Sequence, residues 1–246
     1  MIRSILVVIF LLLFVLFVGI PFILYAALTG AVDTLYRVAL RGLRGMLWLG
    51  GARVRVEGLD NVPPGVCIFV ANHTSNSDPP AIVVAIPKRV SVLAKKEVFR
   101  LPILATAFRL AGIVPVDRGA HDSAAASVDK AIQSLKSGLS FLVYPEGTRS
   151  SDGRLLPFKK GTFLMAIEAG VPIVPVSVVG AHKIMRKGEW AIHPGEIVVK
   201  FHPLVDASRY TLEQRGELLE RVQAAVAAGL PEDQQPAATA NETAQA

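Results

Sequence analysis

The sequence predicts an α/β fold: a mixed, partly parallel central sheet flanked by helices, with an N-terminal hydrophobic helical membrane element. Two observations predict it. Short apolar runs alternate with stretches of helical periodicity, which is typical of a sheet with parallel strand pairs. Ahead of them, residues 4–32 contain no Asp, Glu, Lys, Arg or His. We therefore expect a membrane-embedded and interfacial segment at 1–50, a globular domain at 51–230 and a disordered tail at 231–246.

The uncharged run at residues 4–32 is longer than the apolar core of a signal peptide, and longer than one perpendicular membrane span requires. Pro21 interrupts it, because proline removes a helix hydrogen bond and crowds the preceding turn. Two interpretations remain open. The run is either one kinked span or two shorter helices, at 4–19 and 22–32, that dip into one leaflet.

The next segment, residues 33–49, predicts a helix that carries Arg37, Arg41 and Arg44 on one face. This pattern is typical of a helix at a negatively charged membrane surface, and packing against the globular domain explains it equally well. The arginines follow the apolar run closely. By the positive-inside rule they place the domain on the cytoplasmic side of a cell membrane.

Within the domain, apolar runs and helical periodicity indicate the elements. Strands are expected at residues 66–71, 90–94, 112–116, 139–144, 171–179 and 196–201. Helices are expected at residues 79–86, 102–111, 123–137 and 160–169. A last helix is expected to open at Thr211, because Thr211 and Gln214 have the spacing of a capping box.

The composition and the charge distribution exclude some classes of protein and favour certain ligands. The chain has 246 residues, is 52% hydrophobic and has a formal net charge of +6, which excludes a wholly disordered protein. Basic residues concentrate between positions 87 and 118, a patch that attracts nucleic acid, anionic lipid headgroups or phosphorylated small molecules. The apolar N-terminus favours lipid over nucleic acid. The single cysteine, Cys67, lies in an apolar run and predicts a buried small side chain. No Cys/His spacing suggests a metal site.

One candidate for chemistry is the pair His73 and Asp78, directly after the strand expected at 66–71. Five residues apart on one regular helix, the two side chains would not meet. They meet if His73 lies in a loop and Asp78 caps a helix that has Pro79 in its first turn. The imidazole would then be a general base and the carboxylate its orienting partner. The alternative is that Asp78 only caps a helix.

Three further blocks follow strands. The first spans residues 144–150, Tyr-Pro-Glu-Gly-Thr-Arg-Ser, in which Gly147 allows close backbone approach and Arg149 suits a phosphate. The second spans residues 113–118 and ends in Arg118. The third, residues 171–176, contains two prolines in a strand-like run, as an edge strand or the wall of a site would. The carboxyl ends of strands in such sheets are where ligands bind.

Taken in this order, the four blocks resemble those of the glycerolipid acyltransferase family, specifically bacterial 1-acylglycerol-3-phosphate acyltransferases. The resemblance covers residues 51–205. It implies that His73 is the general base and Asp78 its partner. It also implies an acceptor site made by Lys96, Arg118, Glu146, Gly147, Thr148 and Arg149. Tyr144 and Ser77 are mild departures, because the family often has phenylalanine and an apolar residue there.

The resemblance also implies the reaction. His73 would deprotonate the sn-2 hydroxyl of lysophosphatidic acid, which attacks an acyl-CoA or acyl carrier protein thioester and gives phosphatidic acid. No metal or cofactor is expected. Membrane lipids are expected partners, and nucleic acid is not. The expected location is the bacterial inner membrane, with the domain on the cytoplasmic side and a two-helix N-terminal element in one leaflet. Alternatives are another acceptor, such as glycerol-3-phosphate, another lysophospholipid or a lyso-aminolipid, a membrane-bound thioesterase or hydrolase, and a non-catalytic lipid-binding protein.

Overall fold

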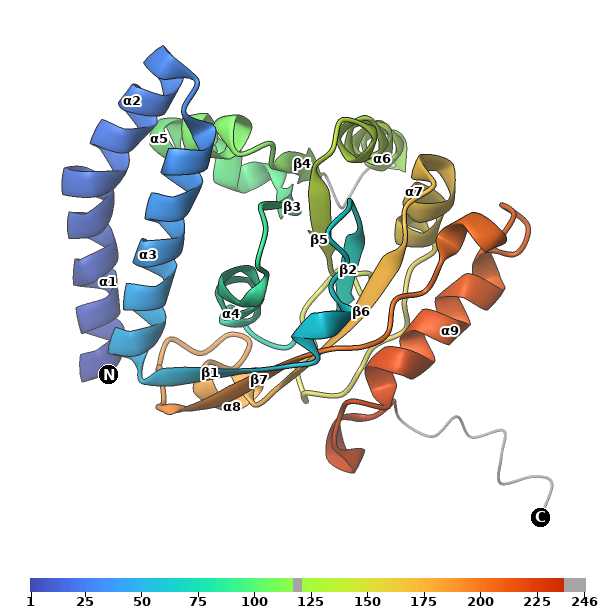
Figure 1. Ribbon diagram of the computed structural model, residues 1–246. Coiled ribbons are helices and arrows are strands. Elements are labelled where there is room, and N and C mark those ends of the chain that lie inside the picture. Colours follow the sequence, from blue (N-terminus) through green and yellow to red (C-terminus); the bar gives the residue numbers. More distant parts are fainter. Residues whose placement is uncertain (117–120, 237–246) are drawn as a thin grey trace.

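The computed structural model describes residues 1–116 and 121–236. In these residues a seven-stranded sheet has the order β1-β7-β6-β2-β5-β3-β4 (Figure 1). Its strands are β1 (Ala52–Glu57), β2 (Ile68–Ala71), β3 (Val90–Lys95), β4 (Val114–Val116), β5 (Ser140–Val143), β6 (Ile173–Val179) and β7 (Gly195–Phe201). Neighbouring strands are parallel except β6 and β7, which are antiparallel. The predicted mixed, partly parallel sheet is confirmed.

Helices cover both faces of this sheet (Figure 1). The layer on one face contains α6 (His121–Lys136), α7 (Gly161–Ala169) and α9 (Arg215–Ala227). The layer on the other contains the end of α3 (Val32–Gly50), α4 (Asp78–Ala85) and the short α8 (Ala181–Ile184). Ile68 and Val70 of β2 pack into the first layer, and Phe69 and Ala71 into the second. β2 is therefore buried along its whole length, which explains its unbroken apolar sequence.

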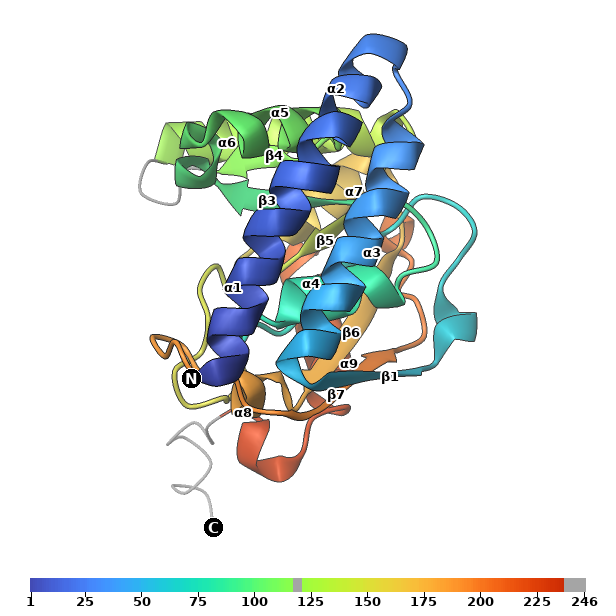
Figure 2. The ribbon, with the colours of Figure 1, turned by 90° about the vertical axis from the view of Figure 1, so that its left-hand side faces the viewer.

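The N-terminal run forms one continuous helix, not the two short ones considered above. It comprises α1 (Ile2–Phe14), a π-helical turn (Val15–Gly19) and α2 (Ile20–Thr29). Pro21 lies in the first turn of α2, and the π turn directly before it changes the hydrogen-bonding pattern without ending the helix. Gly30 ends the helix with a left-handed backbone, φ +72°. α3 then runs back beside α1, so the two-helix element is α1–α2 paired with α3 (Figures 1 and 2).

Two glycines of α3 allow this hairpin to pack closely. A Cβ on Gly42 would lie 2.5 Å from the Phe14 ring, and a Cβ on Gly45 would lie 2.7 Å from the Phe10 ring. The two rings therefore fill the space that these glycines leave. α2 also packs against α5 (Pro102–Leu110), where Phe22, Ala107 and Leu110 surround a small apolar cluster.

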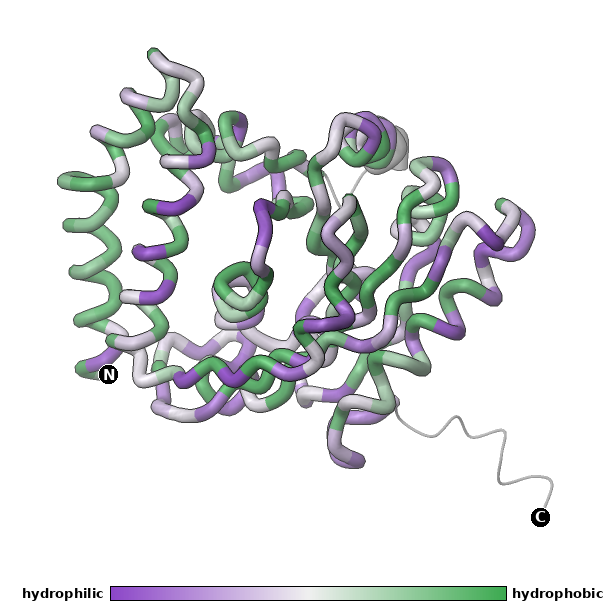
Figure 3. The backbone as a smooth tube through the Cα atoms, in the orientation of Figure 1, coloured by the Kyte–Doolittle hydropathy of each residue, from purple (hydrophilic) through white to green (hydrophobic). Residues whose placement is uncertain are grey.

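The outer surface of the α1–α2 helix is apolar and uncovered. Its most hydrophobic window has a mean hydropathy of 3.2 and is only 6% buried, and Figure 3 shows the hydrophobic colour along its length. Among the described residues this is the one helix with the length and composition to cross a membrane. By contrast, Arg37, Arg41, Arg44 and Trp48 form an exposed row on α3.

The structure differs from the expected elements in two places. β1 was not predicted, because its arginines interrupt the apolar pattern. It nevertheless pairs with β7 over its whole length. The last helix begins at Arg215, four residues after Thr211. Only half of the capping box forms: the Thr211 N–H donates to Gln214 Oε1 at 3.1 Å.

The domain also extends past the expected boundary at residue 230. Residues Glu232–Gln234 form a 3₁₀ turn, and the Leu155 N–H donates to the Gln234 carbonyl at 2.8 Å. Gln234 is 3% exposed. The start of the expected disordered tail is therefore packed against the domain, and residues 237–246 lie outside the described residues.

Candidate active site

His73 lies in the loop that follows β2, at the carboxyl end of that strand. The preceding residue fixes where the loop begins. The Asn72 side chain donates to the Val178 carbonyl at 2.9 Å and accepts from the Val178 N–H at 2.7 Å. The main-chain pairing of β2 with β6 ends at Ala71, and the Asn72 side chain adds one more pair of hydrogen bonds to β6. These bonds fix the position at which the chain leaves the sheet, directly before His73.

The structure brings His73 and Asp78 together. His73 Nδ1 lies 2.9 Å from Asp78 Oδ2, and the same oxygen accepts from the Thr74 and Ser75 N–H groups at 2.7 Å each. Asp78 is fully buried, and the imidazole is 12% exposed. Because Asp78 Oδ2 already accepts from two backbone N–H groups, it acts as an acceptor toward the ring as well, and Nδ1 carries the ring proton. Nε2 then has the lone pair that a general base needs.

Asp78 does not act as the N-cap that we expected. α4 begins at Asp78, and its N-cap residue is Ser77, whose side chain makes no capping hydrogen bond. The carboxylate instead turns back toward the loop of His73. An interpretation of Asp78 as a helix cap alone is therefore wrong.

A second loop, the turn at residues 144–150 after β5, clamps His73 by three contacts. The Tyr144 ring stacks on the imidazole, with centroids 4.1 Å apart and planes at 22°. Glu146 Oε1 accepts from the His73 N–H at 2.7 Å. The Ser150 N–H donates to the His73 carbonyl at 2.8 Å. β2 and β5 are neighbouring parallel strands, so their following loops meet at one edge of the sheet.

Tyr144 was noted in the sequence only as a departure from a family pattern. In the structure its ring orients His73, and its hydroxyl is buried without a hydrogen-bond partner among residues 1–116 and 121–236. Burial holds the pKa of the Tyr144 phenol well above its usual range, and the Asp78 charge adds to the effect. A stacking contact between two residues so far apart in the chain leaves no signal in the sequence.

Glu146 is buried beneath the loop that contains His73 and does not lie at an open surface. It is 3% exposed, and burial raises its pKa to about 8. The His73 N–H opposes this shift, and the Asp78 carboxylate adds to it. The side chain is therefore largely protonated at neutral pH, and its observed contact is structural support for His73.

The middle of the 144–150 turn, Gly147 to Arg149, is more exposed than its two ends. Gly147 has φ +72°, and a Cβ there would lie 2.9 Å from Lys159 Nζ, which brings this lysine to the turn. Thr148 is exposed. Arg149 is half-buried, and its guanidinium has no ion-pair partner within the described part of the chain. Lys159 was not among the expected acceptor residues, although its place in the sequence close to the turn could have indicated it.

Of the other expected acceptor residues, Lys96 is exposed and begins a 3₁₀ helix (Lys96–Arg100) at the carboxyl end of β3. Arg118 lies outside the described residues. β4 ends two residues before it, and β4 is parallel to β3. The carboxyl ends of β2, β5, β3 and β4 therefore share one edge of the sheet, with His73, the 144–150 turn and Lys96 along it.

Comparison with known proteins decides the family. Residues 53–179, more than half of the chain, match the family model described as Acyltransferase. The chain belongs to the acyltransferase family. The acyltransferase is 32% identical to the 1-acyl-sn-glycerol-3-phosphate acyltransferase of Limnanthes alba over 211 residues, which is 85% of this chain and 74% of the relative. It is 30% identical to that of Borreliella burgdorferi, over 70% of this chain and 69% of the relative.

A solved structure is also similar. The 1-acyl-sn-glycerophosphate (LPA) acyltransferase PlsC from Thermotoga maritima superposes on this acyltransferase with a TM-score of 0.80. The sequences are 30% identical, and the match covers 93% of each chain. The fold, including the N-terminal helical hairpin, is therefore shared along nearly the whole chain.

Proposed function

We propose that this acyltransferase moves a fatty acyl group from a thioester to the sn-2 hydroxyl of 1-acylglycerol-3-phosphate and so makes phosphatidic acid. The observation that carries the proposal is the contact of His73 Nδ1 with the buried Asp78 carboxylate, which leaves Nε2 as an acceptor. The names of the relatives from Limnanthes alba and Borreliella burgdorferi support the choice of acceptor.

The proposed mechanism is direct transfer. His73 Nε2 takes the proton of the acceptor hydroxyl while that oxygen attacks the thioester carbonyl carbon. The carbon–sulfur bond of the tetrahedral intermediate breaks, and the imidazolium returns its proton to the leaving thiolate. Asp78 stabilises the imidazolium between these steps and keeps the required tautomer. The mechanism needs no acyl-enzyme, metal or cofactor, and acyl-CoA or an acyl carrier protein supplies the thioester.

In this proposal the acceptor phosphate is bound by the cations at the carboxyl ends of the parallel strands, the edge where His73 also lies. Arg149, Lys96 and Arg118 carry it in this proposal, and Lys159 joins them through its position beside Gly147. A guanidinium grips a phosphate through two parallel hydrogen bonds, which fixes the orientation of the acceptor as well as its affinity. The sn-2 hydroxyl then stands near His73, and proximity supplies part of the rate.

We place the enzyme at the bacterial inner membrane with the domain on the cytoplasmic side. The uncovered apolar surface of the α1–α2 helix supports a seat in lipid. The exposed row of Arg37, Arg41 and Arg44 on α3 supports contact with the phosphates of anionic headgroups. Membrane lipids are therefore proposed partners besides the two substrates.

The test is an assay of the purified enzyme with one labelled acyl thioester and several acceptors. We expect lysophosphatidic acid to be acylated far faster than glycerol-3-phosphate or other lysophospholipids. Free fatty acid as the main product with acceptor in excess would mean a hydrolase instead. Repeating the assay with acyl-CoA and acyl carrier protein thioesters identifies the donor.

Arg149→Ala tests the phosphate assignment in the same assay. Loss of one charge-assisted contact, worth about 2 kcal/mol, should raise the acceptor KM about 30-fold. The donor KM should change little. The matched control is Arg154→Ala, which removes an exposed arginine close to the turn. Equal increases in both KM values for Arg149→Ala would contradict the assignment.

A further inference from the structure

The segment from residue 185 to residue 192, between α8 and β7, is bonded to three distant parts of the molecule; we refer to it as the 185–192 loop. The Ile192 N–H donates to Ser4 Oγ of α1 at 3.0 Å. Ser75 Oγ, in the loop of His73, donates to the Met185 carbonyl at 2.8 Å. Lys187 Nζ donates to the Arg149 carbonyl at 2.7 Å. One short loop thus joins the apolar helix, the catalytic loop and the 144–150 turn.

The outer side of the 185–192 loop has the composition of a membrane interface. Trp190 is 57% exposed. Arg186 and Lys187, close to it in the sequence, are exposed cations. Tryptophan prefers the boundary between headgroups and acyl chains, and long cationic side chains reach from that depth to phosphates. The loop carries two cations, Arg186 and Lys187, and one carboxylate, Glu189, so its net charge is positive.

The 185–192 loop lies against the N-terminal end of α1, as Figures 1 and 2 both show. Trp190, Ser4, Val7 and Val8 line one apolar cleft of about 230 Å³, and Ser77, the residue before α4, lines it too. The apolar surface continues from Trp190 along α1. Its exposed members there are Ile2, Ile5, Leu6, Val8, Ile9, Leu12 and Leu13.

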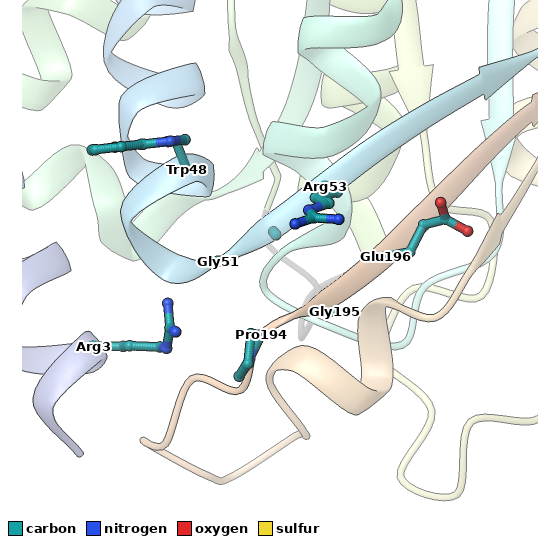
Figure 4. Close-up of a pocket in the computed structure, with 8 residues that line it drawn as sticks. Arg3, Trp48, Gly51, Arg53, Pro194, Gly195 and Glu196 are labelled. Carbon is teal, nitrogen blue, oxygen red and sulfur yellow. The ribbon is translucent and has the colours of Figure 1, made fainter.

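A second tryptophan lies at the same end of the helical hairpin, where α1 begins and α3 ends. Figure 4 shows Trp48 projecting from the last turn of α3, with Arg3 of α1 pointing toward Gly51 beside Pro194. The Arg3 guanidinium and the Pro194 ring are the groups that a Cβ on Gly51 would meet first. Trp48, Trp190 and Arg3 therefore surround this end of the hairpin, in the way that aromatic and cationic residues surround a membrane protein at headgroup depth.

We propose that the 185–192 loop is a membrane-contact segment that couples the seating of the enzyme on a lipid surface to the geometry of its active site. Trp190 enters the interface beside α1. Ser4 fixes the loop to the helix, and the bonds to Ser75 and Arg149 carry that position to the base and to the phosphate turn. The coupling rests on the proposed membrane location, and Ser4 acts as a positioning residue.

The contact is tested by fluorescence. The chain has 2 tryptophans, so full-length Trp48→Phe protein reports on Trp190 alone. Vesicles of phosphatidylcholine and phosphatidylglycerol with brominated acyl chains should quench its emission and shift it to shorter wavelength. Sedimentation of the protein with the vesicles, without quenching, would overturn the contact. This readout does not depend on the acceptor, so it can fail while the proposed function stands.

The coupling is tested by Ser4→Ala, which removes the acceptor of the Ile192 N–H. We expect about a fivefold loss of kcat/KM on acceptor presented in vesicles, the equivalent of one buried hydrogen bond, with little change on a short-chain soluble acceptor. The matched control is Thr29→Ala, because the Thr29 hydroxyl makes local contacts: it donates to the Tyr25 carbonyl and accepts from the Ala31 N–H. Equal loss on both acceptors, or no loss on either, would overturn the coupling.

Two substitutions of Trp190 separate side-chain chemistry from folding. Trp190→Phe keeps an aromatic group at the interface and should retain activity on vesicles. Trp190→Gln should lose about tenfold, because it removes the apolar area that enters the lipid. Activity on the soluble acceptor should be the same for both. A Trp190→Gln protein that matches Trp190→Phe on vesicles would contradict the proposal.

Discussion

The imidazole of His73 is oriented by one contact at its edge and one on its face. Asp78 accepts from Nδ1, and the Tyr144 ring covers one side. The main chain of His73 is bonded on both sides as well, to Glu146 and Ser150. Such a residue has little freedom to leave the position in which Nε2 faces a substrate, and pre-organisation of this kind is what general-base catalysis requires.

His73→Ala should remove most of the turnover while the protein stays folded and membrane-bound. General-base catalysis contributes about 10²–10⁴-fold in rate, so kcat should fall by that factor. The comparison is with His193→Ala, since His193 is exposed and its side chain makes no hydrogen bond among the described residues. The measurement is product formation per folded enzyme. Near-full activity of His73→Ala would exclude the base assignment.

Tyr144 offers a test of the stacking contact. Tyr144→Phe keeps the ring and removes a buried hydroxyl that has no partner in the described residues, so kcat should be unchanged and stability equal or slightly higher. Tyr144→Leu removes the ring and should lower kcat up to about tenfold, the value of one aromatic contact. The acceptor KM should change less than kcat. A Phe variant as impaired as the Leu variant would show that the hydroxyl, not the stack, is needed.

Glu146 makes the stability of the enzyme depend on pH. Its pKa is about 8 in the folded state, above its usual value in an unfolded chain, so the folded state binds more protons between those two values. The stabilisation is fully present below the unfolded pKa and is lost as pH rises through about 8. Glu146→Gln should flatten this part of the profile, by at most about 1.4 kcal/mol per pH unit.

The measurement for Glu146→Gln is the free energy of unfolding by urea at pH 5 to 9 (roughly the range in which linkage acts). Glu168→Gln is the control, because Glu168 is exposed on α7 and the chemical change is identical. The control should keep the slope of the unmodified protein. An unchanged slope in Glu146→Gln would mean that Glu146 is ionised throughout.

At the scale of elements, the fit between α1 and α3 depends on two missing side chains. Phe14 and Phe10 pack where Gly42 and Gly45 have no Cβ. Glycine inside a helix costs about 1 kcal/mol relative to alanine. The close packing of the two rings offsets that cost, and it determines how the apolar helix is held against the row of arginines on α3.

Gly42→Ala should therefore destabilise the protein, although alanine is the better helix former. Its Cβ would lie 2.5 Å from the Phe14 ring, and overpacking of this kind costs about 1–3 kcal/mol. The same change at Gly216 of α9, where no atom lies within 4 Å, should stabilise by up to about 1 kcal/mol. Unfolding midpoints in mild detergent measure both. Shifts of the same sign would contradict the packing argument.

At the scale of the whole molecule, the sequence was sufficient to predict those strands that are buried on both faces of the sheet. β2 and β5 read as apolar runs because both faces are covered, and parallel strands put their following loops at one edge. The residues alone left the His73–Asp78 contact as one of two alternatives, and the family resemblance favoured it. β1 was not predicted, because Arg53 and Arg55 lie on the exposed face of an outer strand and hide its pattern.

Several of the contacts that the sequence did not reveal are long-range. The stack of Tyr144 on His73 and the bond of Asn72 to Val178 join residues far apart in the chain. Each involves a residue type common in loops and strands, so neither leaves a local pattern. The same holds for the 185–192 loop, whose three partners lie on three other segments. Pairing of this kind depends on strand order, which periodicity does not determine.

The bond between Ser4 and Ile192 spans 188 positions of the chain, and this separation has a consequence for synthesis. A ribosome makes α1 well before β7. Before Ile192 is made, α1 can pack against α3 and α2 against α5, so the hairpin emerges as a pair of helices with one apolar side uncovered. At the proposed membrane location, lipid is the first cover available to that side. The hairpin would then meet the bilayer before the sheet is complete.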